Sequence, residues 1–127
     1  MTALDTPDIF RVIHLDLARE PGSPEGSAQD RYTLVLPLDG DGRIEPNYCR
    51  EFPDLCRVAH SSRVGGIHRG LVRRDADGTW VFDYGDADEA TEIGFRLGEE
   101  RFVPGEYVSV VRDGQEHPYR VVSLQKI

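Results

Sequence analysis

The residues best suited to chemistry lie in one short segment, residues 60–70, which reads His-Ser-Ser-Arg-Val-Gly-Gly-Ile-His-Arg-Gly. Its two adjacent glycines allow backbone N–H groups to approach a ligand closely. Its hydroxyls and guanidiniums are groups that bind carboxylates and phosphates. No helix pattern follows the segment, so it is not a Walker loop. The candidate ligand-binding residues are Arg63, Gly65, Gly66, His68, Arg69 and Asp86.

The charge of the chain changes sign immediately after this segment. Residues 55–74 carry five arginines and no carboxylate, whereas residues 75–92 carry seven carboxylates and no lysine or arginine. If the two stretches form neighbouring strands, their charges can pair across the strands on a solvated face, and each pair contributes roughly 0.2–1 kcal/mol. Cross-strand pairing is therefore the alternative to anion binding for these arginines.

The register of the hairpin that joins the two stretches decides which side chains meet. A two-residue turn at Asp77-Gly78 places Arg73 opposite Phe82. A three-residue loop that ends in a bulged Gly78 shifts the parity and places Arg74 opposite Trp80. The sequence leaves both registers open.

The same choice decides which member of the predicted anion site faces its acidic partner. The two-residue turn places Arg69 opposite Asp86, and the three-residue loop places His68 there. In both registers the basic and acidic strands lie side by side.

Cysteine and histidine do not form a recognisable metal site. Cys49, Cys56, His60 and His68 are separated by six, three and seven residues, and this spacing fits no standard zinc pattern. We expect two buried free thiols and no metal or other cofactor.

A catalytic triad can be drawn only loosely. Ser61 or Ser62 could be combined with His60 or His68 and with Asp86, but the chain has no Gly-x-Ser-x-Gly nucleophile elbow. Lys126 is the only lysine, which leaves essentially no candidate for a Schiff-base mechanism. We therefore predict no catalytic residue.

Composition narrows the classes of partner. The chain has 127 residues and a net charge of −8, which argues against binding to nucleic acids and to anionic membranes. The N-terminus has neither the cationic nor the apolar part of a secretory signal, and two cysteines do not make a disulfide framework. We expect a cytoplasmic protein, and the strong preference for arginine over lysine is typical of a GC-rich bacterial genome.

The elements that must position these residues are short strands separated by turn signals. The pattern predicts strands over residues 8–19, 31–38, 56–60, 68–74, 79–84, 93–97, 106–112 and 118–125, and one helix over residues 45–52. It is typical of an all-β fold with one short helix, a small, partly open β-barrel of about seven strands with the helix covering one end. We expect a single domain over residues 1–127.

One strand and the last hairpin have apolar faces of particular interest. Trp80, Phe82 and Tyr84 share one face of their strand, where core packing is expected and the wall of a binding groove is the alternative. The last hairpin is apolar on both faces, so it is buried on both sides or has one face against a partner. One face has Val108, Val110, Tyr119 and Val121, and the other has Tyr107, Val111, Val122 and Leu124.

Two resemblances concern the end of the chain. Residues 102–110 resemble the Pro-Gly-Gln-Tyr-Val strand of ferredoxin-reductase-type flavin barrels, but residues 117–123 lack that family's Arg-x-Tyr-Ser segment. The strand from Pro104 to Val110, the Asp113-Gly114 turn and residues 117–123 also resemble small uncharacterised β-barrel proteins of alphaproteobacteria. That resemblance implies no activity.

These observations favour a non-enzymatic binding or protein-interaction module, with a protein partner or a second copy of the chain as the expected partner. The alternative is a protein or enzyme that binds a small phosphate or carboxylate through residues 60–70.

Overall fold

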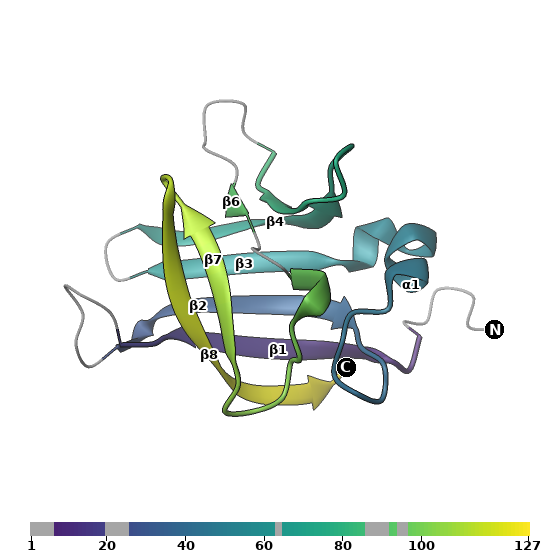
Figure 1. Cartoon of the computed structure of the whole chain (residues 1–127), viewed down its shortest axis with the longest axis horizontal. Helices are drawn as coiled ribbons and strands as arrows, with labels where there is room; N and C mark the ends of the chain where they lie inside the picture. Colours follow the sequence, from purple (N-terminus) through teal and green to yellow (C-terminus); the bar gives the residue numbers. More distant parts are fainter. Residues whose placement is uncertain (1–6, 20–25, 63–64, 86–91, 94–96) are drawn as a thin grey trace.

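The computed structural model describes residues 7–19, 26–62, 65–85, 92–93 and 97–127. These residues form a mostly antiparallel β-structure with one short α-helix (Figure 1), so the predicted fold class is confirmed. The strands are β1 (Phe10–Leu17), β2 (Ser27–Pro37), β3 (Arg57–Ser62), β4 (Gly66–Arg74), β5 (Trp80–Asp83), β6 (Glu92–Ile93), β7 (Tyr107–Arg112) and β8 (Gln115–Lys126). The helix is α1 (Pro46–Glu51), and 3₁₀ turns follow at Pro53–Leu55 and Leu97–Glu99.

The strands are hydrogen-bonded in chain order, and β8 returns to pair with β1. The ring is thin at one place, because β6 pairs through two residue pairs with β5 and through one, Ile93 with Val111, with β7. Seven of the strands form one curved sheet that curls through 256°. The wall is therefore continuous from β7 through β8 and β1 to β5 and weak at β6, as a partly open barrel requires.

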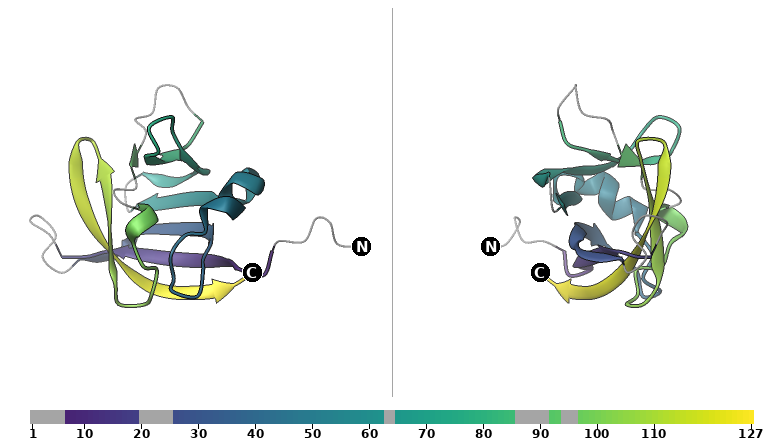
Figure 2. Two further views of the ribbon diagram at one scale, coloured as in Figure 1. Left: turned by 45° about the vertical axis from the view of Figure 1, so that its right-hand side comes forward. Right: turned by 90° about the vertical axis from the view of Figure 1, so that its left-hand side faces the viewer.

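Apolar side chains at every second position of the strands fill the interior of the barrel. Tyr32, Leu34, Leu36 and Leu38 are all buried on one face of β2 and just beyond it, as their spacing predicts. In the last hairpin, one of the two apolar faces lies inside, with Val108, Val110, Tyr119 and Val121 buried. On its outer face, Tyr107 is 59% exposed. Figure 2 shows β7 and β8 standing across the sheet formed by β1 to β3.

The helix lies beside one end of the barrel (Figures 1 and 2). Pro46 begins α1, where a missing N–H costs nothing, and Pro53 follows its end. Phe52 packs edge-on against Phe10, with 6.3 Å between the ring centroids, and so fixes the helix to the core. Within the described parts of the chain, no helix combines the length and apolarity that crossing a bilayer requires.

The hairpin between β4 and β5 adopts the second of the two registers. Arg74 lies opposite Trp80, and Gly78 has φ of +81°. The Asp75 carboxylate accepts hydrogen bonds from the N–H groups of Asp77 and Thr79, at 2.9 and 3.0 Å. This carboxylate therefore fixes the three-residue loop, with glycine at the position that needs positive φ.

Two predicted strands differ most from the structure. The strand expected over residues 93–97 is reduced to β6, because Leu97 begins a 3₁₀ turn, and residues 94–96 lie outside the described residues. Strand β2 begins at Ser27, four residues before its predicted start at residue 31, because Ser27 pairs with Leu17 beyond a bulge in β1. A polar strand end of this kind depends on its partner and has no hydrophobic alternation of its own.

Gly70 is a position where the sheet tolerates no side chain. A Cβ atom there would lie 2.1 Å from the backbone oxygen of Asp83 and 2.8 Å from Cα of Tyr84. We expect Gly70→Ala to lower the free energy of unfolding by about 1–3 kcal/mol, because β4 and the end of β5 must separate. Urea unfolding measures this, and Gly40→Ala is the matched control because nothing lies within 4 Å of its Cβ position. Equal stability of the two variants would contradict the close packing of β4 and β5.

Candidate functional site

The predicted anion site at residues 60–70 lies on the hairpin of β3 and β4. Arg63 and Asp86 lie outside the described residues, so their part in the site stays a prediction. The N–H of Gly65 donates to Ser62 Oγ at 2.9 Å, and Gly66 has φ of +70°. The described part of this Gly-Gly segment therefore closes a turn, and one of its N–H groups is already engaged.

The two histidines of this segment are neighbours across the strands. His60 lies opposite His68, so both occupy the same face of the sheet. His60 is 9% exposed, whereas His68 is exposed and its ring meets that of Tyr84 at 6.2 Å between centroids. The structure thus brings His68 and Arg69 to the surface and places His60 inside.

Residues 55–74 and 75–92, whose opposite charges we call the charge switch, form an ion pair across two strands, as the cross-strand alternative to anion binding predicts. Arg73 forms an ion pair with Asp83 on the neighbouring strand. The hydrogen bond from Arg73 and the one from the Gly85 N–H lower the pKa of the Asp83 carboxyl. Arg74 instead places its guanidinium 4.9 Å from the centroid of the Trp80 ring. One arginine of the switch is therefore paired with a carboxylate, and another is stacked on an aromatic ring.

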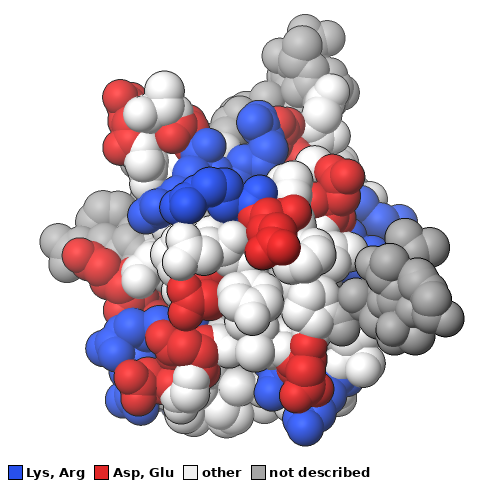
Figure 3. All heavy atoms as spheres, turned by 90° about the vertical axis from the view of Figure 1, so that its right-hand side faces the viewer, with Lys and Arg blue, Asp and Glu red and all other residues white. Residues whose placement is uncertain are grey.

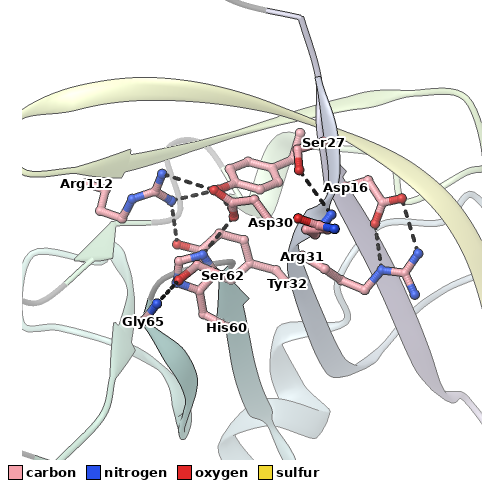
Figure 4. Close-up of polar contacts among 11 residues, drawn as sticks. Asp16, Ser27, Asp30, Arg31, Tyr32, His60, Ser62, Gly65 and Arg112 are labelled. Atoms are coloured by element: carbon pink, nitrogen blue, oxygen red, sulfur yellow. Dashed lines mark hydrogen bonds and ion pairs between the residues drawn. The ribbon is translucent and has the colours of Figure 1, made fainter. Parts of the chain in front are cut away.

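A polar network in the barrel interior, which includes His60, was not predicted from the sequence. It joins strands that are far apart in the chain, and Figure 4 shows the side chains of β2, β3 and the β7–β8 hairpin converging. Its members are Asp30 and Tyr32 of β2, His60 of β3, Arg112 of β7 and Tyr119 of β8.

The carboxylate of Asp30 is the centre of this network. Its Oδ1 atom lies 2.8 Å from Nε2 of His60 and accepts a hydrogen bond from the Tyr119 hydroxyl, also at 2.8 Å. Arg112 donates from Nη1 to the hydroxyls of Tyr119 and Tyr32, at 2.7 and 3.1 Å, and its Nη2 lies 3.7 Å from Asp30 Oδ2. The His60 ring stacks on that of Tyr32 at 4.2 Å.

The environment fixes the charge states of this network. Burial disfavours the ionised form of Asp30, but the hydrogen bonds from His60 and Tyr119 outweigh it, so the pKa of Asp30 lies below its ordinary value. Burial raises the pKa of Tyr119, which outweighs the opposing effect of Arg112. At neutral pH the network therefore holds an ionised carboxylate, a guanidinium and a neutral phenol that donates its proton to Asp30.

This arrangement suits stabilisation better than hydrolysis. An Asp–His contact can orient a general base, and the two serines that the sequence allows as nucleophiles follow His60 on β3, where each has its own neighbour. Ser62 Oγ accepts from Gly65, and Ser61 lies opposite Ile67. The carboxylate beside His60 is Asp30, whereas the triad was drawn with Asp86.

A second site lies at the end of the barrel beside α1. It is a pocket of about 270 Å³ formed by α1, the following 3₁₀ turn and the adjoining ends of β4 and β5. Figure 3 views this end of the molecule and shows basic side chains gathered on it, with acidic side chains around them. The lining residues are Pro46, Cys49, Arg50, Pro53, Val72, Arg73, Arg74 and Trp80.

The three guanidiniums of this pocket, which we call the basic pocket, are held in place by their neighbours. Arg73 is paired with Asp83, and Arg74 lies over Trp80. Arg50 donates from Nη1 to Oδ1 of Asn47 at 3.2 Å, across one turn of α1. Trp80 is 4% exposed. The pocket therefore combines charged groups on an exposed rim with an apolar wall.

Two cysteines meet at the basic pocket. Cys49 of α1 is half-buried in its lining, and Cys56 is fully buried beside it, with its thiol 3.8 Å from the backbone oxygen of Phe52. Each cysteine shifts the pKa of the other, so that Cys56 lowers the pKa of Cys49 and Cys49 raises that of Cys56. Both are free thiols, as predicted, although Cys49 is only half-buried. Among the described residues, no three His, Cys, Asp or Glu side chains are grouped to hold a metal.

The sequence contained part of the signal for the basic pocket. Arg73 and Arg74 belong to the charge switch, and Trp80 belongs to the aromatic face considered as a possible groove wall. Arg50 gave no signal, because only the position of α1 brings it to β4.

No protein-family model matches the chain, and neither the curated proteins nor the solved structures contain a significant match.

Proposed function

We propose that this protein is a non-enzymatic binding module that takes the phosphate or carboxylate group of a small ligand in the basic pocket. One observation carries the proposal. Three of the eight lining residues are arginines and none is a carboxylate, in a chain with 23 acidic and 15 basic residues. A concentration of positive charge against the sign of the whole molecule favours an anion at this point.

The side chains of the pocket suit a small ligand with an apolar part. Guanidiniums bind phosphate and carboxylate oxygens through paired N–H groups. Pro46, Pro53 and Val72 supply apolar surface beside them. A volume of about 270 Å³ lies just below the usual range for the pockets of drug-sized ligands, which begins at about 300 Å³. The pocket therefore fits an anionic group with a short apolar body.

The positions of the arginines reduce the cost of binding. Arg50, Arg73 and Arg74 each have a neighbour that restrains the guanidinium before a ligand arrives. A side chain that is already ordered loses less conformational entropy on binding. The lining includes no histidine or carboxylate that could act as a general base, which supports binding rather than turnover.

A thermal-shift comparison tests the proposal. Phenyl phosphate, benzoate and inorganic phosphate should each raise the melting temperature in a saturable way, because a ligand that binds only the folded state stabilises it. Sodium chloride at matched ionic strength controls for screening of the acidic surface. If all four salts give the same shift, the proposal is wrong.

A second candidate is the predicted protein interaction through the outer face of the last hairpin. Tyr107 is the observation that favours it, since this aromatic ring is 59% exposed on that face. Light scattering after size exclusion tests whether two copies associate, and Tyr107→Ser should return a dimer to the monomer.

A further inference from the structure

We propose that Cys49 and Cys56 are a redox-reactive dithiol, in which a hydroperoxide oxidises Cys49 and Cys56 then closes an intramolecular disulfide. The inference goes beyond anion binding and does not rest on it, because it requires only access of a small oxidant to the basic pocket.

The positions of the two thiols differ in the way this chemistry needs. Cys49 faces the basic pocket and is half-buried, whereas Cys56 is fully buried in the core. Val72 adjoins both of them, because its N–H donates to the Cys56 backbone oxygen at 2.9 Å and it lines the basic pocket together with Cys49. Each cysteine is also the largest influence on the pKa of the other. An oxidant in the pocket therefore meets Cys49 first, and the group that meets the oxidised sulfur next is Cys56.

The surroundings of Cys49 favour its thiolate, which is the reactive form of cysteine. The neighbouring Cys56 side chain is the largest cause of the lowered pKa of Cys49. The positive charge of Arg74 acts in the same direction, and burial and Glu45 oppose it. The pKa of Cys56 is raised instead, by its neighbour Cys49 and by burial, so Cys56 stays a neutral thiol.

The reaction balances with a hydroperoxide as the oxidant. The Cys49 thiolate attacks one peroxide oxygen, so that an S–O bond forms, the O–O bond breaks and hydroxide or alkoxide leaves with the electron pair. The Cys56 sulfur then attacks the sulfenic acid of Cys49, so that the S–S bond forms and the S–O bond breaks. The proton of the Cys56 thiol leaves with the hydroxide as water. The two thiols are oxidised and the peroxide is reduced.

The bond would close a short loop next to the basic pocket. Cys49 lies on α1 and Cys56 directly precedes β3, so the bond would join two parts of one local segment. Phe52 anchors that segment against Phe10 from within the closed loop. Neither cysteine belongs to a strand of the barrel.

Mass spectrometry of the full chain after treatment with hydrogen peroxide tests the proposal. The mass of wild type should fall by that of two hydrogen atoms, and the protein should remain a single chain. After proteolytic digestion, the peptides that contain Cys49 and Cys56 should be found linked by a disulfide. Cys56→Ser should stop at the sulfenic acid, which dimedone traps on Cys49. Arg74→Gln should slow the reaction roughly threefold.

Cys49→Ser is the matched control. It leaves Cys56 in its buried position, so it should react at least roughly tenfold more slowly than wild type. Cys56→Ala repeats the trapping experiment with a smaller, apolar side chain if Cys56→Ser proves unstable. Reaction of Cys56 in Cys49→Ser, or oxidation of wild type only between chains, would overturn the proposal. Anion binding is measured on reduced protein, so its failure would be a separate result.

Discussion

Asp30→Ala should lower the free energy of unfolding by about 3–4 kcal/mol, which makes it the most destabilising single change considered for this protein. The substitution removes the carboxylate that His60 and Tyr119 both contact. It also leaves Arg112, whose side chain is 20% exposed, without its ion-pair partner. Half-buried polar groups that lose their partners keep most of their desolvation cost, and this is why the loss exceeds that of a surface pair.

Urea unfolding at neutral pH measures this effect, and Asp41→Ala is its control. Asp41 also faces an arginine, at 3.9 Å from Arg43, but its side chain is 76% exposed. The control should therefore cost less than about 0.5 kcal/mol. Similar losses for the two variants would show that the buried network contributes no more than a surface ion pair.

The contribution of Asp30 to the free energy of unfolding should also depend on pH. The pKa of Asp30 in the folded protein lies below its ordinary value, so the stabilisation is fully present above the pKa of the unfolded chain, about 4. It is lost as the pH falls through the lower folded value. The difference in stability between wild type and Asp30→Asn should therefore shrink as the pH falls below about 4. A constant difference would mean that the charge of Asp30 is not stabilising.

The second large effect concerns binding. Replacing Arg73 and Arg74 together by glutamine should weaken binding of phenyl phosphate about a hundredfold. Each charge-assisted hydrogen bond contributes about 1.5–3 kcal/mol, and 1.4 kcal/mol corresponds to a tenfold change. Stability should change little, because the Arg73–Asp83 pair is exposed. Isothermal titration calorimetry measures both the affinity and the stoichiometry.

The matched control removes the same charge from the same stretch of sequence. Arg57 and Arg69 are exposed on β3 and β4, and neither lines the basic pocket. Replacing both by glutamine should weaken binding less than about threefold, through the loss of long-range attraction alone. If this control loses as much affinity as the pocket variant, the predicted site at residues 60–70 is favoured over the basic pocket.

The sequence predicted those features that depend on local pattern. Alternation identified the buried face of β2, turn residues identified the hairpins, and two prolines bounded α1. The register of the β4–β5 hairpin depends on whether the Asp75 side chain binds the loop backbone. Both turn types suit the same residues, so the sequence could not decide between them.

The sites were harder to predict because they depend on closure of the barrel. Asp30 and Tyr119 are separated by 89 positions and touch only because β2 and β8 both flank β1. Asp30 also lies one residue before the predicted start of its strand at residue 31. Arg50 joins Arg73 and Arg74 through the packing of α1 against the barrel, which a strand pattern does not contain.

A ¹H–¹⁵N NMR titration with inorganic phosphate tests the location of binding most directly. Trp80 is the only tryptophan of the chain, so its indole N–H gives one signal. We predict that this signal and the side-chain Nε–H signals of Arg50, Arg73 and Arg74 shift together and saturate, while the backbone signals of residues 65–69 stay in place. Shifts confined to residues 65–69, or no saturable shift at any site, would contradict anion binding in the basic pocket.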